Sequence, residues 1–212
     1  MKIKNIIWDW NGTLINDAYL FVNIMNTTLI KQGLPEISLA DYKNNFCFPI
    51  QKYWKKLGFK FTKTQFDTMN ASFLALYRSK MKEPDLQPHA LDVLSFAKKQ
   101  SIKQFVLSAS EHNLLLESVR FYKIEHFFVD VVGVDNLNAE GKELLAKNLM
   151  NKHGLIGSET VVIGDTLYDE RVAAAISAGL FLVACGHFNK DRLNVKRAEI
   201  CNSLIDIIPL LV

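Results

Sequence analysis

The stretch KIKNIIWDWNGTLIND, residues 2–17, begins as an apolar strand and stops at a carboxylate. Its apolar run, NIIW (5–8), ends at Asp9, and Asn11 and Gly12 follow in a sequence typical of a turn. A continuous apolar run, without alternation, is typical of a strand that is buried on both faces. The stretch therefore predicts a first strand of a parallel sheet with polar groups at its carboxyl end.

Composition excludes several classes of protein. The 212 residues are 49% hydrophobic, which allows a substantial core and one domain with an insertion. The net charge of +3 comes from 25 basic and 22 acidic residues without a long basic run, so we expect no nucleic-acid partner. No stretch reaches the roughly 18 to 20 apolar residues of a membrane span. The three unpaired cysteines indicate a reducing compartment, and we expect a cytoplasmic protein.

Short apolar runs alternate with segments of helical spacing in the rest of the chain. Strands are expected at 5–8, 103–108, 127–132, 160–164 and 180–184, and helices at about 88–100, 111–121, 141–153 and 167–178. This β-α alternation predicts an α/β fold, with a doubly wound parallel sheet covered by helices.

Residues 16–86 interrupt this alternation, because they contain helix-like pieces and no convincing strand. The pieces are residues 17–33, 38–46, 49–58 and 62–81, and the Pro-rich stretch EPDLQPHA (83–90) is the expected return linker. So long a segment is not an ordinary connection. We therefore expect a catalytic core formed by 1–15 and 87–212 and an inserted helical cap formed by 16–86.

Carboxylates follow two of the predicted strands. Asp9 follows the first, and Asp165, with Asp169 shortly after it, follows the fourth. Ligands of open parallel sheets bind outside the carboxyl ends of the strands, so these side chains are expected at one edge. A group of oxygen ligands suits Mg²⁺, which commonly binds through one or two carboxylates and a substrate phosphate. Ser108 at the end of the second strand and Lys142 at the start of a helix would add phosphate-binding groups.

Four motifs in this order resemble the haloacid dehalogenase superfamily of phosphotransferases. They are DWNGTL (9–14), VLSAS (106–110), Lys142 in EGKELLAKN, and GDTLYD (164–169). The position of the helical insertion resembles the phosphoglycolate phosphatase-like branch. The resemblance implies a Rossmann-like core, a Mg²⁺ cofactor and a small phosphorylated metabolite as the substrate. It does not indicate an oligomeric state.

The resemblance also implies a role for each matching residue. Asp9 would be the nucleophile that forms an aspartyl phosphate, and it would also bind the metal. The remaining metal ligands would be the Asn11 backbone carbonyl, Asp165 and Asp169. The phosphoryl group would be held by Asn11, Gly12, Ser108, the amide of Ala109, and Lys142.

Each of these residues also has a purely structural interpretation. Asp9 could form only a turn, Ser108 could satisfy backbone groups, Lys142 could be an exposed helix residue, and Asp169 could favour only the start of its helix. His187 follows the last predicted strand, and a surface turn is preferred there over substrate contact.

The aromatic residues of the insertion and its lysines are also given structural interpretations. Phe46, Phe48, Tyr53 and Trp54 are interpreted mainly as core. Lys52, Lys55 and Lys56 are interpreted as a solvated face.

Asn11 departs from the family pattern, because most of these phosphatases carry a second aspartate there that acts as general acid and base. Loss of such a group typically costs 10²- to 10⁴-fold in rate. The expected function is a slow, Mg²⁺-dependent phosphatase that is sensitive to the leaving group. Three alternatives stay open: a phospho-ligand-binding protein with an impaired site, a phosphonoacetaldehyde hydrolase-like enzyme that uses a cap lysine, and deamidation of Asn11 to aspartate before Gly12.

Overall fold

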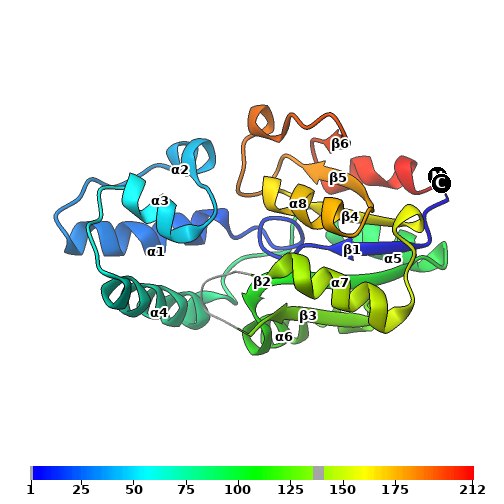
Figure 1. Ribbon diagram of the computed structural model, residues 1–212, viewed down its shortest axis with the longest axis horizontal. Helices are drawn as coiled ribbons and strands as arrows, with labels where there is room; N and C mark the ends of the chain where they lie inside the picture. Colours follow the sequence, from blue (N-terminus) through cyan, green and yellow to red (C-terminus); the bar gives the residue numbers. More distant parts are fainter. Residues whose placement is uncertain (1, 136–140) are drawn as a thin grey trace.

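Six parallel strands form a single sheet in the computed structural model, which describes residues 2–135 and 141–212. The order is β3-β2-β1-β4-β5-β6, so the chain winds outward from β1 in both directions (Figure 1). The strands are β1 (Asn5–Trp8), β2 (Lys103–Glu111), β3 (Asp130–Val134), β4 (Thr160–Gly164), β5 (Gly179–Val183) and β6 (Ala198–Cys201). The predicted doubly wound α/β fold is confirmed.

Helices cover both faces of this sheet. Successive strand residues point to opposite sides, and because the strands are mainly apolar, both faces have to be buried. On one face Ile7, Phe105 and Val162 pack in the same buried cluster as residues of α7 (Lys142–His153) and α8 (Leu167–Ala175). On the other face Ile6 and Val106 share a cluster with residues of three further helices. These are α5 (Ala90–Lys99), α6 (His112–Phe121) and the 3₁₀ helix η4 (Leu204–Leu211).

Four helices lie between β1 and α5 and form the group seen beside the carboxyl ends of the strands in Figure 1. They are α1 (Ala18–Lys31), α2 (Leu39–Asn45), α3 (Ile50–Lys56) and α4 (Lys63–Lys80). Capping boxes at Ser38 and Thr62 start α2 and α4, because each hydroxyl accepts a backbone N–H while the residue at the third helical position reaches back. The four helix-like pieces read in the sequence are confirmed, whereas the division into core and cap domains stays a prediction.

The structure corrects one of the strand predictions and adds a strand. The run 127–132 begins with part of a 3₁₀ turn, η1 (Glu125–Phe127), and the strand is β3, which starts only at Asp130. The aromatic side chains of Phe127 and Phe128 pack on the core, so the run is apolar before the strand begins. The edge strand β6 was not predicted, because it is four residues long and its middle residues are not buried.

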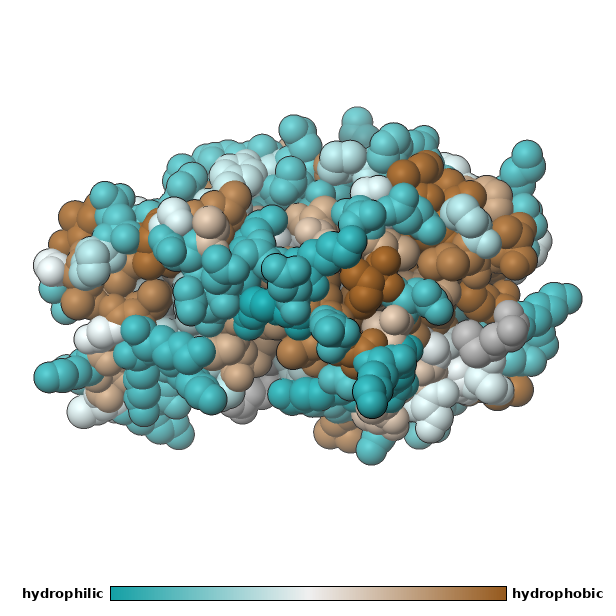
Figure 2. Space-filling view, turned by 90° about the horizontal axis from the view of Figure 1, so that it is seen from above, coloured by the Kyte–Doolittle hydropathy of each residue, from teal (hydrophilic) through white to brown (hydrophobic). Residues whose placement is uncertain are grey.

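None of the helices in the described residues is both long and apolar enough to cross a bilayer. Figure 2 shows hydrophilic side chains over much of the face seen from above, with hydrophobic side chains gathered at the end where both termini lie and also at the opposite end. The cytoplasmic location stays a prediction.

Candidate active site

Three carboxylates meet at the carboxyl edge of the sheet because β1 and β4 are neighbours. Trp8 pairs with Ile163 in the strand register, and the Asp9 backbone N–H donates to the Ile163 carbonyl at 2.8 Å. The residues that follow, Asp9 and Asp165, therefore lie at the same point of the edge. One oxygen each of Asp9, Asp165 and Asp169 lies within 4.8 Å of the others. The predicted convergence of the three side chains is confirmed.

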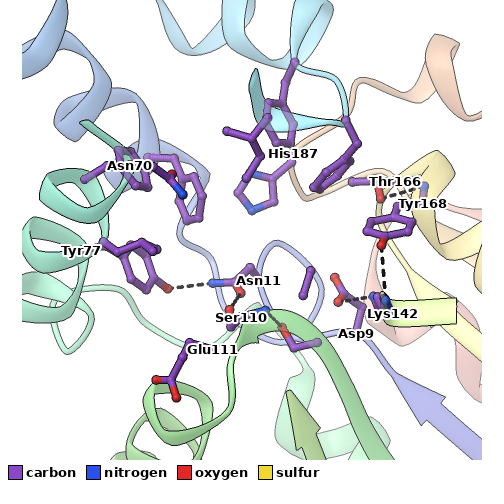
Figure 3. A pocket seen from close by; sticks show the side chains of 18 of the residues that line it. Asp9, Asn11, Asn70, Tyr77, Ser110, Glu111, Lys142, Thr166, Tyr168 and His187 are labelled. Atoms are coloured by element: carbon purple, nitrogen blue, oxygen red, sulfur yellow. Dashed lines mark hydrogen bonds and ion pairs between the residues drawn. The ribbon is translucent and has the colours of Figure 1, made fainter. Parts of the chain in front are cut away.

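Lys142 lies inside this group, and its interpretation as an exposed helix residue is wrong. It is the first residue of α7 and is only 3% exposed. Its Nζ donates to Asp9 Oδ1 at 2.6 Å and to Asp169 Oδ1 at 2.7 Å. Figure 3 shows Lys142 and Asp9 pointing toward one another across the floor of the pocket. A buried ammonium between two carboxylates is held in one position and compensates part of their charge.

Asp169 combines the two interpretations that the sequence left open. Its Oδ2 accepts hydrogen bonds from the backbone N–H and the hydroxyl of Thr166, which closes a capping box at the start of α8. Its Oδ1 accepts the hydrogen bond from Lys142. The helix therefore fixes the carboxylate that in turn orients the lysine.

Burial dominates the electrostatics of the carboxylate group. It raises the pKa of Asp9, and the nearby charges of Asp169 and Asp165 add to this against the opposing effect of Lys142. It also raises the pKa of Asp165, with Asp169 adding to the effect. The pKa of Lys142 is raised as well, because Asp169 and Asp9 outweigh the effect of burial. The lysine therefore stays charged, and a further cation at the carboxylates would favour their ionised forms.

Glycine lets the loops of this edge approach closely. Gly12 has φ +77°, and a Cβ there would overlap the Asp165 carboxylate and the His187 ring. A Cβ at Gly186 would overlap the same carboxylate. Thr13 Oγ1 donates to Asp165 Oδ1 at 3.1 Å and the His187 backbone N–H donates to Asp165 Oδ2 at 2.5 Å, so Asp165 is fixed on both oxygens.

The predicted phosphate-binding residues lie around one pocket. Asp9, Asn11, Ser108, Ala109, Lys142 and Asp165 line it, whereas Gly12 and Asp169 support it from behind. Ser108 is buried, and its hydroxyl accepts the Ser110 backbone N–H at 3.0 Å. The structural interpretation of Ser108 therefore holds together with its place in the pocket.

The side chain of Asn11 is fixed by three hydrogen bonds. Its Nδ2 donates to Asp17 Oδ2 at 2.6 Å. The same Nδ2 donates to the Tyr77 hydroxyl oxygen at 2.7 Å, and Oδ1 accepts from Ser110 Oγ at 2.6 Å (Figure 3). The Tyr77 hydroxyl itself donates to Asp17 Oδ2 at 2.8 Å. An amide is the group that this environment requires, because it can donate to Asp17 where a second carboxylate would repel it.

His187 is buried at the pocket, so the surface-turn interpretation is wrong. It is 4% exposed, its Nδ1 lies 2.8 Å from the Tyr42 hydroxyl, and its Nε2 lies 3.3 Å from Asp17 Oδ1. Burial alone would lower its pKa, but the contact with Asp17 and the charges of Asp165 and Asp9 raise it. The histidine is therefore a polar group between the carboxylate edge and the helical insertion.

The donor set suits a hard divalent cation. Three carboxylates with oxygens this close repel one another in a buried place, and Lys142 compensates only part of their charge. Oxygen-only donors match Mg²⁺, and Asn11 lies in the loop directly after Asp9, where the predicted backbone ligand would be. Asp9, Asp165 and Asp169 are thus the residues that would hold the ion or orient its ligands.

The other wall of the pocket consists of aromatic residues from the helical insertion. Phe46, Phe48 and Trp54 line the pocket, while Tyr53 is buried beneath it. The core interpretation is confirmed for Phe46, Tyr53 and Trp54, which are almost fully buried, and two of these also face the pocket. The lysines of α3, Lys52, Lys55 and Lys56, are exposed as predicted and do not line the pocket.

The sequence patterns did not indicate two buried polar residues that contact Asn11, namely Asp17 and Tyr77. Asp17 occupies the N-cap position of α1, yet its side chain makes no capping bond and turns back to Asn11 and the Gly12 N–H. Tyr77 sits 66 residues away from Asn11 in sequence, in the last turns of α4. The position of Asp17 shortly after the first motif could have indicated that it belongs to the site. No sequence pattern around Tyr77 indicates that it contacts Asn11.

Comparisons with known proteins agree with this geometry. The profile of the family described as haloacid dehalogenase-like hydrolase matches residues 6–184, and the chain belongs to this family. A phosphoglycolate phosphatase from Aliivibrio fischeri is 18% identical over 216 residues, covering 93% of this chain and 91% of that protein.

Solved structures share the fold over nearly the full length. A haloacid dehalogenase-like hydrolase from Bacteroides fragilis has a TM-score of 0.86 at 18% identity, covering 97% of this chain and 100% of that one. CbbY from Rhodobacter sphaeroides, in complex with xylulose-(1,5)-bisphosphate, has a TM-score of 0.75 at 15% identity, covering 97% of this chain and 96% of that one. The profile therefore makes the protein a hydrolase of this family, and the solved structures show that it shares their fold.

Proposed function

We propose that this hydrolase is a Mg²⁺-dependent phosphatase of a small phosphorylated metabolite and works through an aspartyl phosphate on Asp9. The observation that carries the proposal is the placement of Asp9 beside Asp165 and Asp169, with Lys142 Nζ 2.6 Å from Asp9 Oδ1 at the floor of a pocket. The phosphoglycolate phosphatase of A. fischeri and the sugar bisphosphate bound by CbbY support a phosphorylated substrate.

The first step would be the attack of one Asp9 carboxylate oxygen on the phosphorus atom. The O–P bond to the leaving group breaks, and the leaving oxygen keeps the bonding electron pair. A water molecule then attacks the phosphorus of the aspartyl phosphate, which releases inorganic phosphate and restores the carboxylate. Lys142 holds Asp9 in position and compensates negative charge at the phosphoryl oxygens. When bound, Mg²⁺ would add positive charge beside the same oxygens.

Asn11 sets the limit of this chemistry, because an amide does not ionise near neutral pH and so can neither protonate the leaving oxygen nor take a proton from water, and all its polar atoms are hydrogen-bonded. A leaving group that departs as a stable anion needs no proton donor. We therefore expect faster turnover of acyl and aryl phosphates than of alkyl phosphates, by about 10²-fold, the lower end of a general acid's typical contribution.

Steady-state assays with p-nitrophenyl phosphate and acetyl phosphate test the function, each with Mg²⁺ and with EDTA. We expect Mg²⁺-dependent release of phosphate that Asp9→Asn abolishes and that the exposed control Asp67→Asn leaves intact. Acid quenching of the wild type during turnover of ³²P-labelled acetyl phosphate should trap labelled protein, and Asp9→Asn should not be labelled. Turnover that survives in Asp9→Asn would sink the covalent mechanism.

A phospho-ligand-binding protein is the second candidate. It is favoured by the Asn11 side chain, because all its polar atoms are hydrogen-bonded and the amide cannot act as general acid or base. In that case phosphate would bind with Mg²⁺ by calorimetry while none of the phosphate esters is turned over. The third candidate, phosphonoacetaldehyde cleavage, requires a lysine that reaches the substrate. Lys52, Lys55 and Lys56 are exposed and lie outside the pocket lining, so the structure does not favour it.

A further inference from the structure

We propose that the leaving group of the substrate is uncharged and largely apolar, so that the enzyme prefers phosphomonoesters of aryl or bulky alkyl alcohols over those that carry a carboxylate or a second phosphate. This inference rests on the proposed function, because it assumes that the phosphoryl group binds at Asp9. It concerns the part of the pocket beyond the carboxylate edge, between the sheet and helices α1 to α4.

The wall of this chamber is mainly apolar, although α4 also contributes the polar side chains of Asn70 and Tyr77. Helix α1 provides Phe21 and Met25, the segment from Phe46 through α3 provides Phe46, Phe48 and Trp54, and α4 provides Phe73. The rings pack against one another in tilted or edge-on arrangements, for example Phe21 on Phe73 with centroids 5.4 Å apart and Phe46 on Phe48 at 5.2 Å. Faces of this kind bind aromatic and aliphatic groups by excluding water.

The positive charges near the chamber are already matched by negative ones. Lys142 is the one lysine or arginine among the described residues that line the pocket, and its Nζ is shared between Asp9 and Asp169. The imidazole of His187 also lies at the pocket, but Asp17 Oδ1 lies 3.3 Å from its Nε2. A second anionic group on the substrate would find no unpaired cation there.

Negative charge at the chamber adds to this preference. The carboxylates of Asp9, Asp165 and Glu111 all line the pocket, and Glu111 keeps its charge by accepting the Asn113 and Leu114 backbone N–H groups at the start of α6. A carboxylate transferred from water into this place loses hydration and meets like charges, which weakens its binding when no partner is present. An uncharged ring in the same place gains from burial of its apolar surface.

A matched pair of esters measures the preference directly. We would compare 4-ethylphenyl phosphate with 4-(carboxymethyl)phenyl phosphate, which have similar shapes and phenols of nearly equal acidity, so that they differ mainly in charge. We expect kcat/KM to be on the order of 100-fold higher for the ethyl compound. Equal values, or a preference for the carboxylate, would overturn the inference while leaving the phosphatase function in place.

A charge introduced into the wall should reverse this order. Leu74 lines the chamber from α4 and is half-buried, so a longer side chain there can reach the pocket. We expect Leu74→Lys to raise kcat/KM for the carboxylated ester at least about tenfold relative to the ethyl ester, whereas the neutral control Leu74→Met keeps the wild-type ratio. A Leu74→Lys ratio equal to that of Leu74→Met would contradict the assignment of this chamber to the leaving group.

A binding experiment covers the case in which the protein turns over no ester. The non-hydrolysable pair 4-ethylbenzylphosphonate and 4-(carboxymethyl)benzylphosphonate would be titrated into the wild-type protein with Mg²⁺ in a calorimeter. Tighter binding of the ethyl compound would support the apolar chamber even if the proposed catalysis fails. Equal or tighter binding of the carboxylated compound would overturn it, and so would the absence of binding by both.

Discussion

At the scale of single residues, Asp17 organises the environment of Asn11. Its side chain is completely buried, and its two oxygens accept the Gly12 backbone N–H, the Asn11 amide and the Tyr77 hydroxyl. It thereby connects the loop after β1 with α4. A buried carboxylate with three donors is favourable only as long as all three are satisfied.

The first prediction replaces this carboxylate by an amide. Asp17→Asn replaces one acceptor oxygen by an NH₂ group, which cannot accept a hydrogen bond, and leaves the other oxygen without charge. The three donors to Asp17 therefore lose part of their partner, and we expect the free energy of unfolding to fall by about 2–4 kcal/mol. Urea unfolding followed by circular dichroism measures the change. The exposed control Asp67→Asn should stay within about 0.5 kcal/mol of the wild type. An unchanged midpoint for Asp17→Asn would show that the charge of Asp17 contributes nothing to stability.

The second prediction concerns the chemical stability of the Asn11-Gly12 bond. Deamidation requires the Gly12 nitrogen to attack the side-chain carbonyl of Asn11, but that nitrogen donates to Asp17 and to the Ile15 carbonyl, and the amide is held by three partners. We expect position 11 to remain an amide in the folded protein at pH 8. Peptide mapping after prolonged incubation tests this, with the unfolded chain as the control that should deamidate. Conversion at the same rate in both would reject it.

At the scale of elements, a carboxylate joins the start of β3 to the end of α7. Asp130 Oδ2 accepts from Lys152 Nζ at 2.8 Å and lies 2.8 Å from His153 Nε2. Partial burial would raise the pKa of Asp130, but the two hydrogen bonds from the helix hold it below its usual range. Lys142 is the first residue of α7, so this contact at the other end of the helix supports the position of the element that carries Lys142.

The third prediction follows from the sign of that shift. A carboxyl whose pKa is lower in the folded than in the unfolded chain stabilises the fold above its unfolded pKa of about 4, and this contribution disappears as the pH falls through the folded value. We expect Asp130→Asn to unfold at lower urea concentration than the wild type at pH 7, and the difference to shrink below pH 4. A difference that persists unchanged at pH 3 would contradict an electrostatic origin.

At the scale of the whole molecule, the strand order concentrates negative charge at one place. The order reverses beside β1, and the carboxylates of β1 and β4 therefore face each other instead of being spread along the sheet. This arrangement costs stability in the absence of a cation, because the charges are buried and of like sign.

The fourth prediction is that Mg²⁺ stabilises the entire fold. At a concentration 100 times its Kd, a ligand that binds only the folded state adds about 2.7 kcal/mol, which corresponds to a rise in Tm of about 5–10 °C for a chain of this size. Differential scanning calorimetry with Mg²⁺ and with EDTA measures it. Asp165→Asn should lose the rise, which is measured against the variant's own Tm in EDTA because the amide also disturbs the hydrogen bonds that both Asp165 oxygens accept. The same rise in both proteins would place the ion elsewhere.

The sequence by itself determined the features that depend on local patterns. Continuous apolar runs predicted the buried strands, and 3.6-residue periodicity with capping signals predicted the helices. The motifs around Asp9 and Asp165 marked the ends of two strands. Because parallel strands share one carboxyl edge, these motifs were expected to meet. The α/β fold, five of the six strands and the four helices of the insertion followed from these patterns, although the third strand was placed a few residues too early.

Only the tertiary structure decided which distant side chains meet. Lys142 could have been an exposed helix residue, and its contact with Asp169 depends on how α7 and α8 pack. The environment of Asn11 combines groups from the first loop, α4 and β2, and the burial of His187 depends on the helical insertion. Burial and pKa are set by all neighbours together, whereas a sequence pattern reports only the residues a few positions away.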